Sequence, residues 1–190
     1  MRILCFGDSN TWGFDPRDIF ADPYDSDHRW PDILAAKTGW EVINEGVNGR
    51  QIPRSTYPLR LLREQSGVDL FLVMLGTNDL LQGTSAEEAA ARMELFLSAM
   101  LPHCPQILLV SPPPMKRGSW VETDQLVRES IRLCGEYGKL ARKLNIPFVD
   151  TSDWHIPLAF DGVHFTEEGN HLFAEKLCLT LPQRHGLYCF

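Results

Sequence analysis

Apolar and polar residues follow one another along the chain in blocks that predict strands and helices in turn. Five apolar runs of strand length cover residues 3–6, 40–43, 69–75, 106–110 and 147–149. Stretches with one apolar helical face cover residues 30–38, 57–65, 85–101, 123–144 and 166–181. Strands that are apolar on both faces and separated by helices are typical of a parallel sheet covered on both sides. The pattern therefore predicts an α/β fold.

Several of these helices carry sequence signals at their ends. Ser85 and Glu88 have the spacing of a capping box, and Gly39 and Pro102 are residues that end helices. Residues 14–29 are polar and acidic, so we expect a long loop there, close to the site that the first strand leads to. The tail, residues 182–190, is apolar for a chain end, and we expect it to pack on the domain or on a neighbouring subunit.

The first thirteen residues place a hydroxyl group directly after a buried strand. Gly7 ends the apolar run, and Asp8 and Ser9 follow it. Ligands bind at the carboxyl ends of strands in open α/β sheets, so Ser9 stands where an attacking hydroxyl would be placed. The alternative is that Asp8, Ser9 and Thr11 only cap a helix.

Other polar segments supply the groups that an attacking serine needs. A serine hydroxyl is a poor nucleophile until a base removes its proton, and His164 is the candidate base. Asp161 lies three residues earlier, and a turn at Gly162 would bring its carboxylate to the imidazole.

Attack on an ester would create an oxyanion, which requires donors that are already in place. The Ser9 backbone N–H and the Asn78 side-chain amide are two candidates. A glycine N–H from the segment Gly46–Gly49 is the third, because backbone without a side chain can approach a substrate closely.

These four segments resemble the conserved blocks of the SGNH (GDSL-type) hydrolases. They read GDSN at 7–10, NEGVNG at 44–49, GTND at 76–79 and DGVH at 161–164, in the order of that family. The resemblance implies a flavodoxin-like, three-layer α/β/α sandwich with a five-stranded parallel sheet. It also implies Ser9 as nucleophile, Asp161 and His164 as its partners, and Ser9, Gly49 and Asn78 as oxyanion donors. Gly49 is preferred to Gly46 because it is the last residue of the NxGxxG pattern.

The chain departs from the family at Asn10, where the commonest pattern has leucine. The G-x-S-x-G elbow of α/β-hydrolases is absent, which disfavours that fold. Longer stretches, among them ILCFGDSNTWG and VSPPPM, are similar to a subgroup of oligomeric arylesterases and acyltransferases. That similarity implies a homo-oligomer acting on short acyl esters, with Trp12 either walling the acyl pocket or packing in the core.

Three functions follow from these residues and stay open at this point. The first is a serine esterase that hydrolyses acetyl-type esters through a covalent acyl-enzyme and needs no metal or cofactor. The second is an acyltransferase that passes the acyl group to alcohols or peroxide. The third is an ester- or glycan-binding module without catalysis.

Two other positions also carry residues of catalytic type, but their surroundings disfavour a catalytic role. His155 follows Asp153 by two residues, but no glycine turn or helix cap frames the pair. Ser111 also follows a strand, yet three prolines come after it and predict a rigid wall.

Composition narrows the class of protein further. The chain has 190 residues, which favours a single domain over residues 1–190, and its net charge of -7 without a basic stripe argues against nucleic acid as a partner. Its five cysteines are scattered and odd in number, so neither a zinc site nor a disulfide framework is indicated. We expect no signal peptide, and no apolar run reaches membrane length, so we expect a cytoplasmic protein that takes a small ester and does not bind membranes.

Overall fold

The fold is built on one parallel sheet, which confirms the prediction from the strand pattern. The computed structural model describes residues 1–181 except 21, 55–56, 66 and 105. The strand order is β2-β1-β3-β4-β5. The strands are β1 (Arg2–Gly7), β2 (Glu41–Gly46), β3 (Leu70–Met74), β4 (Ile107–Val110) and β5 (Phe148–Val149). Every neighbouring pair in the order is parallel.

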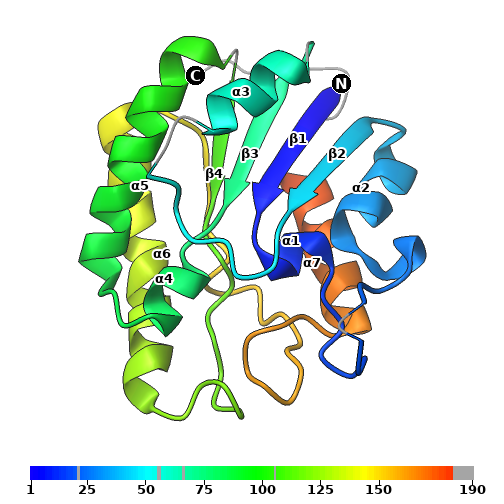
Figure 1. Ribbon diagram of the computed structural model, residues 1–190, viewed down its shortest axis with the longest axis vertical. Helices are drawn as coiled ribbons and strands as arrows, with labels where there is room; N and C mark the ends of the chain where they lie inside the picture. Colours follow the sequence, from blue (N-terminus) through cyan, green and yellow to red (C-terminus); the bar gives the residue numbers. More distant parts are fainter. Residues whose placement is uncertain (21, 55–56, 66, 105, 182–190) are drawn as a thin grey trace.

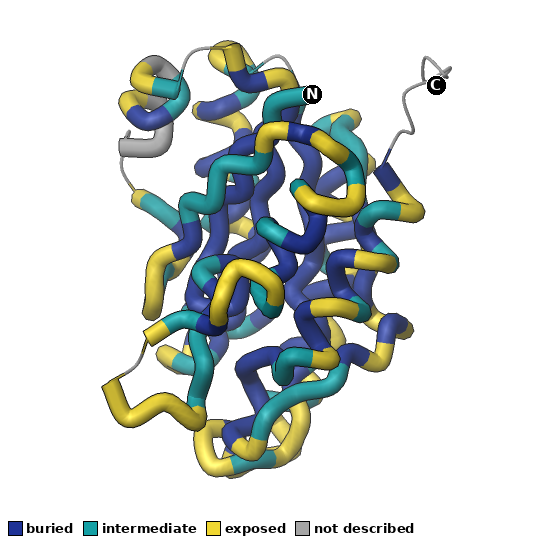
Figure 2. Tube along the Cα trace, turned by 90° about the vertical axis from the view of Figure 1, so that its right-hand side faces the viewer, coloured by how far each residue is buried: buried dark blue, intermediate teal, exposed yellow. Residues whose placement is uncertain are grey.

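Helices cover both faces of the sheet and give the three layers that the family resemblance implied (Figure 1). The larger helices are α2 (Trp30–Thr38), α3 (Tyr57–Glu64), α5 (Ala86–Met100), α6 (Asp124–Leu144) and α7 (Glu167–Thr180). Helices α2 and α7 pack on one face, and α3, α5 and α6 pack on the other. Strand β1 serves both layers, because Ile3 lies in the α2–α7 core and Leu4 lies in the α5–α6 core. Figure 2 shows the resulting buried centre, with exposed residues on the helices and loops around it.

The strand order determines where a site can form. The chain runs from β1 outward to β2 and then crosses back to β3 on the other side of β1. Crevices at such switch points, outside the carboxyl ends of the strands, are where open α/β sheets bind ligands. Two short helices lie at this edge, α1 (Ser9–Trp12) directly after β1 and α4 (Thr77–Leu81) after β3 (Figure 1). Two 3₁₀ turns complete the described elements, at Ser26–His28 and Leu101–His103.

The predicted bounds of the long helices and strands agree closely with the structure, except for one segment at the edge of the sheet. Helix α5 has the capping box of Ser85 and Glu88, and Gly39 caps α2 in a left-handed conformation. Strand β2, however, continues through residues 44–46, beyond the apolar run of 40–43 that predicted it. Gly46 pairs with Gly7 in the ladder, so the neighbouring β1 extends the strand beyond its apolar run.

Two further expectations concern the ends and the outer surface. The tail, residues 182–190, lies outside the described residues, so its expected packing is not tested. In the described part of the chain, no helix combines the length and the apolar character needed to cross a membrane.

Candidate active site

The turn after β1 presents Ser9 at the carboxyl edge of the sheet. Asp8 is the N-cap of α1, and its Oδ1 accepts the Asn10 backbone N–H at 3.0 Å. Gly13 ends the helix with a φ of 94°, in the left-handed region that favours glycine. Gly7 is needed because a Cβ there would lie 1.9 Å from Thr11 Oγ1. The short helix α1 is therefore held at both ends, and Ser9 is its first residue.

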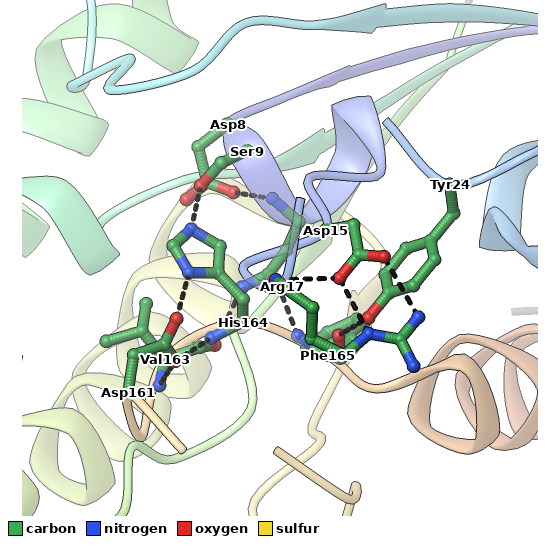
Figure 3. Close-up of polar contacts among 10 residues, drawn as sticks. Asp8, Ser9, Asp15, Arg17, Tyr24, Asp161, Val163, His164 and Phe165 are labelled. Carbon is green, nitrogen blue, oxygen red and sulfur yellow. Dashed lines mark hydrogen bonds and ion pairs between the residues drawn. The ribbon is translucent and has the colours of Figure 1, made fainter. Parts of the chain in front are cut away.

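Three side chains from two distant segments form a continuous hydrogen-bonded row (Figure 3). His164 Nε2 lies 2.9 Å from Ser9 Oγ, and His164 Nδ1 lies 2.7 Å from Asp161 Oδ2. All three residues are buried, with exposed fractions of 6% for Ser9, 2% for His164 and 1% for Asp161. The structure thus brings together the three residues that the sequence proposed as nucleophile, base and orienting acid.

The Asp161 carboxylate is stabilised in its ionised form. Burial raises its pKa, but hydrogen bonds from the His164 ring and from the Val163 and His164 backbone N–H groups outweigh burial, and the net pKa lies below its usual value. An ionised carboxylate can only accept, so Nδ1 of a neutral His164 carries the proton and donates it. Nε2 is then left as an acceptor for the Ser9 hydroxyl, as a general base requires.

The segment between β4 and α6 holds the turn that carries Asp161 and His164. Gly162 has a φ of 82°, and a Cβ on it would lie 2.1 Å from the Lys116 carbonyl oxygen. Lys116 N–H donates to the Gly162 carbonyl at 3.0 Å, and Trp120 N–H donates to the Asp161 carbonyl at 3.1 Å. Gly118 allows the same approach, because its Cβ would lie 2.4 Å from the Asp161 carbonyl carbon. Apart from the rigid wall that the three prolines predicted, no sequence pattern indicated this support.

The structure of the loop after β2 distinguishes between the two glycines that could donate an N–H to the oxyanion. Gly46 is buried, and its N–H already donates to Asn44 Oδ1 at 2.9 Å. Gly49 is exposed with a φ of 73°, and its N–H donates to no group in the described part of the chain. The geometry favours Gly49 as the available donor.

Asn78 lies at the start of α4 and faces the same loop. Its Nδ2 donates to the Arg50 carbonyl at 3.1 Å, which leaves the second N–H of the amide without an acceptor among the described residues. The neighbouring Asp79 is fully buried and braces the loop, because its carboxylate accepts the Ile52 N–H at 3.0 Å and Arg92 Nη1 at 3.1 Å. Asn78 and the loop of Gly49 are therefore fixed relative to each other.

Arg50 ties this loop to the end of β1. Its Nη1 donates to the Gly7 carbonyl at 3.0 Å and to the Glu45 carbonyl, and its guanidinium lies 4.1 Å from the centre of the Phe6 ring. The loop after β2 and the strand that leads to Ser9 are thus joined by one side chain.

Two aromatic rings flank the His164 imidazole, and the sequence did not point to either. The Phe14 ring centroid lies 4.5 Å from that of His164, and the Trp120 ring meets it edge-on at 5.0 Å. Trp12, the aromatic residue that the sequence did single out, ends α1 and is half-buried, with its backbone against Gly46.

The long loop of residues 14–29 is tied down beside the histidine segment (Figure 3). Arg17 pairs with Asp15 through two hydrogen bonds of 2.9 Å and reaches Glu167 at the start of α7 at 2.7 Å. The Tyr24 hydroxyl donates to the Phe165 carbonyl at 3.3 Å. The loop therefore contacts the residue that follows His164.

Asp8 is a buried carboxyl group next to Ser9. Its exposed fraction is 2%, and burial raises its pKa to about 6, against the opposing effects of the Asn10 hydrogen bond and of the charges on His164 and Arg50. This group titrates closer to neutrality than an ordinary aspartate.

The two alternative catalytic candidates, Ser111 and the pair of Asp153 and His155, lie outside this arrangement. Ser111 is fully buried and bonds to Thr151, with the two hydroxyl oxygens 3.2 Å apart. Asp153 and His155 are exposed on the loop after β5. Within the described residues, no three His, Cys, Asp or Glu side chains gather in a way that could hold a metal ion.

Comparison with known proteins identifies the family and the fold. The model of the GDSL-like Lipase/Acylhydrolase family matches residues 5–172. Among solved structures, the inhibitor-bound aryl esterase of M. smegmatis superposes with a TM-score of 0.85 at 29% identity, covering 94% of this chain and 97% of that one. A carbohydrate acetylesterase family member from Sinorhizobium meliloti superposes with a TM-score of 0.80 at 26% identity, covering 95% of this chain and all (100%) of that one. The search of curated proteins found no match.

Proposed function

The chain belongs to the GDSL-like lipase/acylhydrolase family of carboxylic ester hydrolases, and we propose that it is a serine esterase for short acyl esters. One observation carries the proposal, namely the unbroken row from Ser9 Oγ through His164 to Asp161, with distances of 2.9 and 2.7 Å. A row of this kind lets an imidazole remove the serine proton as the serine attacks.

In the first half of the reaction, Ser9 Oγ bonds to the ester carbonyl carbon while His164 Nε2 takes the hydroxyl proton. Asp161 keeps the imidazole oriented and stabilises its positive charge. The carbonyl oxygen becomes an oxyanion, which the N–H groups of Ser9 and Gly49 and the Asn78 amide are available to bind. When the bond to the alcohol breaks, His164 returns the proton to the leaving oxygen, and an acyl-enzyme remains.

In the second half, a water molecule attacks the acyl-enzyme. His164 takes a proton from that water, the bond between the acyl group and Ser9 Oγ breaks, and the proton passes back to Ser9. One ester and one water are consumed, and one acid and one alcohol are released. No other reagent is required for the balance.

The preference for short acyl groups rests on the relatives and on the crowding around His164. Aryl esterase and carbohydrate acetylesterase are the activities named for two similar structures. The Phe14 and Trp120 rings contact the His164 ring, and Trp12 ends the short helix that Ser9 begins. We therefore assign these three aromatic residues to the walls of the substrate site.

Hydrolysis of p-nitrophenyl esters from acetyl to octanoyl tests this function. We expect turnover to fall steeply beyond butyryl and to vanish in Ser9→Ala and His164→Asn. His155→Asn is the matched control, because this exposed histidine has a φ of 53° that asparagine also tolerates, and it should keep full activity. Retention of more than a few per cent of activity by Ser9→Ala would contradict the assignment.

Acyl transfer is a second candidate, favoured by the same apolar surroundings. The Phe14 and Trp120 rings contact the His164 imidazole, the group that would activate water, so an alcohol with an apolar group can compete with water there. Measuring acid against ester product in the presence of a short alcohol separates the two activities. Ester in excess of the share expected from the alcohol's concentration would identify a transferase.

We also propose that the protein is a homo-oligomer, with a small ester as its ligand and no nucleic acid or membrane partner. Large apolar side chains are exposed on loops at the carboxyl edge, with exposed fractions of 88% for Ile19, 80% for Phe20 and 64% for Phe160. Light scattering after size-exclusion chromatography tests this, with Phe20→Ser expected to lower the mass. Leu95→Ser, on α5 at 76% exposure, is the control and should leave it unchanged.

A further inference from the structure

Asn10 is the residue at which the chain departs from the family pattern, and its side chain reaches the histidine segment. Its exposed fraction is 6%. Its Nδ2 donates to the Val163 carbonyl at 3.1 Å, and its Oδ1 accepts the Phe165 N–H at 3.0 Å. These two peptide groups belong to the residues immediately before and after His164, which Figure 3 shows on either side of the imidazole. One amide therefore holds the backbone on both sides of the base.

Resting on the serine mechanism proposed above, we propose that Asn10 is a positioning residue that sets the distance between His164 and Ser9. Asn10 directly follows Ser9 in α1, and its two partners lie 153 and 155 residues away in the sequence. The nucleophile and the base are thus joined by a second route, through backbone, beside the direct bond between their side chains.

The backbone around His164 receives hydrogen bonds from several segments, and two sets of them bear on its position against Ser9. From its own segment, Asp161 Oδ1 accepts the N–H groups of Val163 and His164 at 2.8 and 3.0 Å. From the nucleophile's helix, Asn10 binds the Val163 carbonyl and the Phe165 N–H. Asp161 alone would fix the shape of the turn but not its position against α1. Asn10 supplies that position, and a displacement of about 1 Å at a reacting group costs on the order of 100-fold in rate.

The chemistry of this contact requires an amide. The Val163 carbonyl needs a donor and the Phe165 N–H needs an acceptor, and a neutral amide offers both at the right separation. Leucine offers neither and leaves both backbone groups unpaired. An ionised carboxylate accepts from Phe165 but faces the Val163 carbonyl with a second negative oxygen, whereas a protonated carboxyl can again donate.

The variant Asn10→Asp tests whether the contact requires both a donor and an acceptor, because it preserves the size of the side chain and changes only its hydrogen-bonding groups. The ionisable groups on the adjoining segments are Asp8 in the same turn, Asp161 and His164 in the histidine segment, and Arg50 after β2. Position 10 is buried, with an exposed fraction of 6%, and burial raises the pKa of a carboxyl group, so the introduced carboxyl should gain its proton at a higher pH than an ordinary aspartate does.

We expect Asn10→Asp to lower kcat for p-nitrophenyl acetate about 100-fold at pH 8, with KM changed less than about threefold. Both proteins lose activity as the catalytic imidazole is protonated, so the informative quantity is their ratio. That ratio should recover toward one between pH 8 and pH 5.5, as the new carboxyl gains its proton. Asn10→Leu should show the same loss of kcat with a ratio that does not change with pH.

Asn170 provides the matched control. It is another buried asparagine whose amide joins two backbone groups, accepting the Trp30 N–H at 3.2 Å and donating to the Thr166 carbonyl at 3.1 Å. Asn170→Asp should lower the melting temperature while kcat stays within about threefold of the parent. Thermal unfolding of every variant shows which of them are folded when assayed.

The outcomes separate this inference from the function on which it rests. If His164→Asn stays active, the serine mechanism itself is wrong. If His164→Asn is inactive while folded Asn10→Leu keeps kcat within about threefold of the parent, the mechanism stands and the positioning role is overturned.

Discussion

At the scale of single residues, the site consists of polar groups whose hydrogen-bonding capacity is almost fully used, with a few donors left over. Among the leftover donors in the described residues are the N–H groups of Ser9 and Gly49 and one N–H of the Asn78 amide. They come from the carboxyl ends of three adjacent strands, β1, β2 and β3. Donors fixed before the reaction begins are what a developing oxyanion requires.

Asn78→Ala should therefore lower kcat by roughly 10²–10³ while KM changes little, because its free N–H would strengthen its bond only in the transition state. Steady-state kinetics with p-nitrophenyl acetate measure both constants. The substitution also removes the bond to the Arg50 carbonyl, so the melting temperature must be recorded alongside. A change confined to KM would argue against the oxyanion role.

Asp8 makes stability depend on pH in a direction opposite to that of most carboxylates. Its folded-state pKa, about 6, lies above the ordinary aspartate value of 3.8, so between these two pH values the folded protein holds a proton that the unfolded chain has lost. Raising the pH from 4 to 7 therefore lowers the free energy of unfolding, by up to about 3 kcal/mol from this group.

Asp8→Asn does not titrate and keeps the oxygen that caps α1. Its stability relative to the parent should rise by up to about 3 kcal/mol between pH 4 and pH 7 and then level off. Urea unfolding across this range measures the difference, and Asp153→Asn, an exposed carboxylate, provides the baseline. A difference that shrinks as the pH rises would show that Asp8 is ionised in the folded state.

At the scale of elements, the site depends on how closely the loops approach the short helices. A Cβ on Gly46 would lie 2.1 Å from the Trp12 backbone nitrogen in α1, whereas a Cβ on Gly49 would have no atom within 4 Å. Gly46→Ala should displace α1, and with it Ser9, and abolish activity. Gly49→Ala carries only the strain of its positive φ, roughly 1–2 kcal/mol, so α1 should stay in place and the melting temperature should fall less than in Gly46→Ala.

Comparing the two variants by kcat and by melting temperature tests this account of the loop after β2. Equal losses in both variants would mean that the loop does not approach α1 as described. Near-normal activity in Gly46→Ala would lead to the same conclusion.

Elements with strong local signals could be predicted from the sequence, and elements formed by tertiary contacts could not. Ser85 and Glu88 mark the start of α5 by themselves, and the continuous apolar run of β3 requires burial on both faces. Helices α1 and α4 have four and five residues, too few for a periodic pattern, and their turns are held by tertiary contacts. One such contact is the Tyr137 hydroxyl on the Leu75 carbonyl, at 2.9 Å.

The same distinction applies to the site. Ser9, Asp161 and His164 could be proposed because the chemistry of an activated serine requires these residue types after strands and turns. The contacts of Asn10, Phe14 and Trp120 could not, because each depends on a partner far away in the sequence. The departure of Asn10 from the family motif was the one visible signal, and its meaning required the position of Val163 and Phe165.

At the scale of the whole molecule, the parallel sheet explains why segments so far apart in sequence form one site. All strands point the same way, so the loops that follow β1, β2 and β3 open at one edge, and the segment before α7 returns to it (Figure 1). Ser9 and His164, 155 residues apart, come within 2.9 Å there. The proposed serine esterase mechanism depends on this contact between Ser9 and His164.

Intact-mass spectrometry after treatment with an organophosphonate ester tests that mechanism most directly, because only an activated serine reacts rapidly with such a reagent. We expect the protein to gain the mass of one phosphonyl group, located on Ser9. Ser9→Ala should gain none, and His155→Asn should be labelled at the parent's rate. Hydrolysis of p-nitrophenyl acetate should stop in step with labelling. Labelling at another serine, or full hydrolytic activity in protein that stays unlabelled, would contradict it.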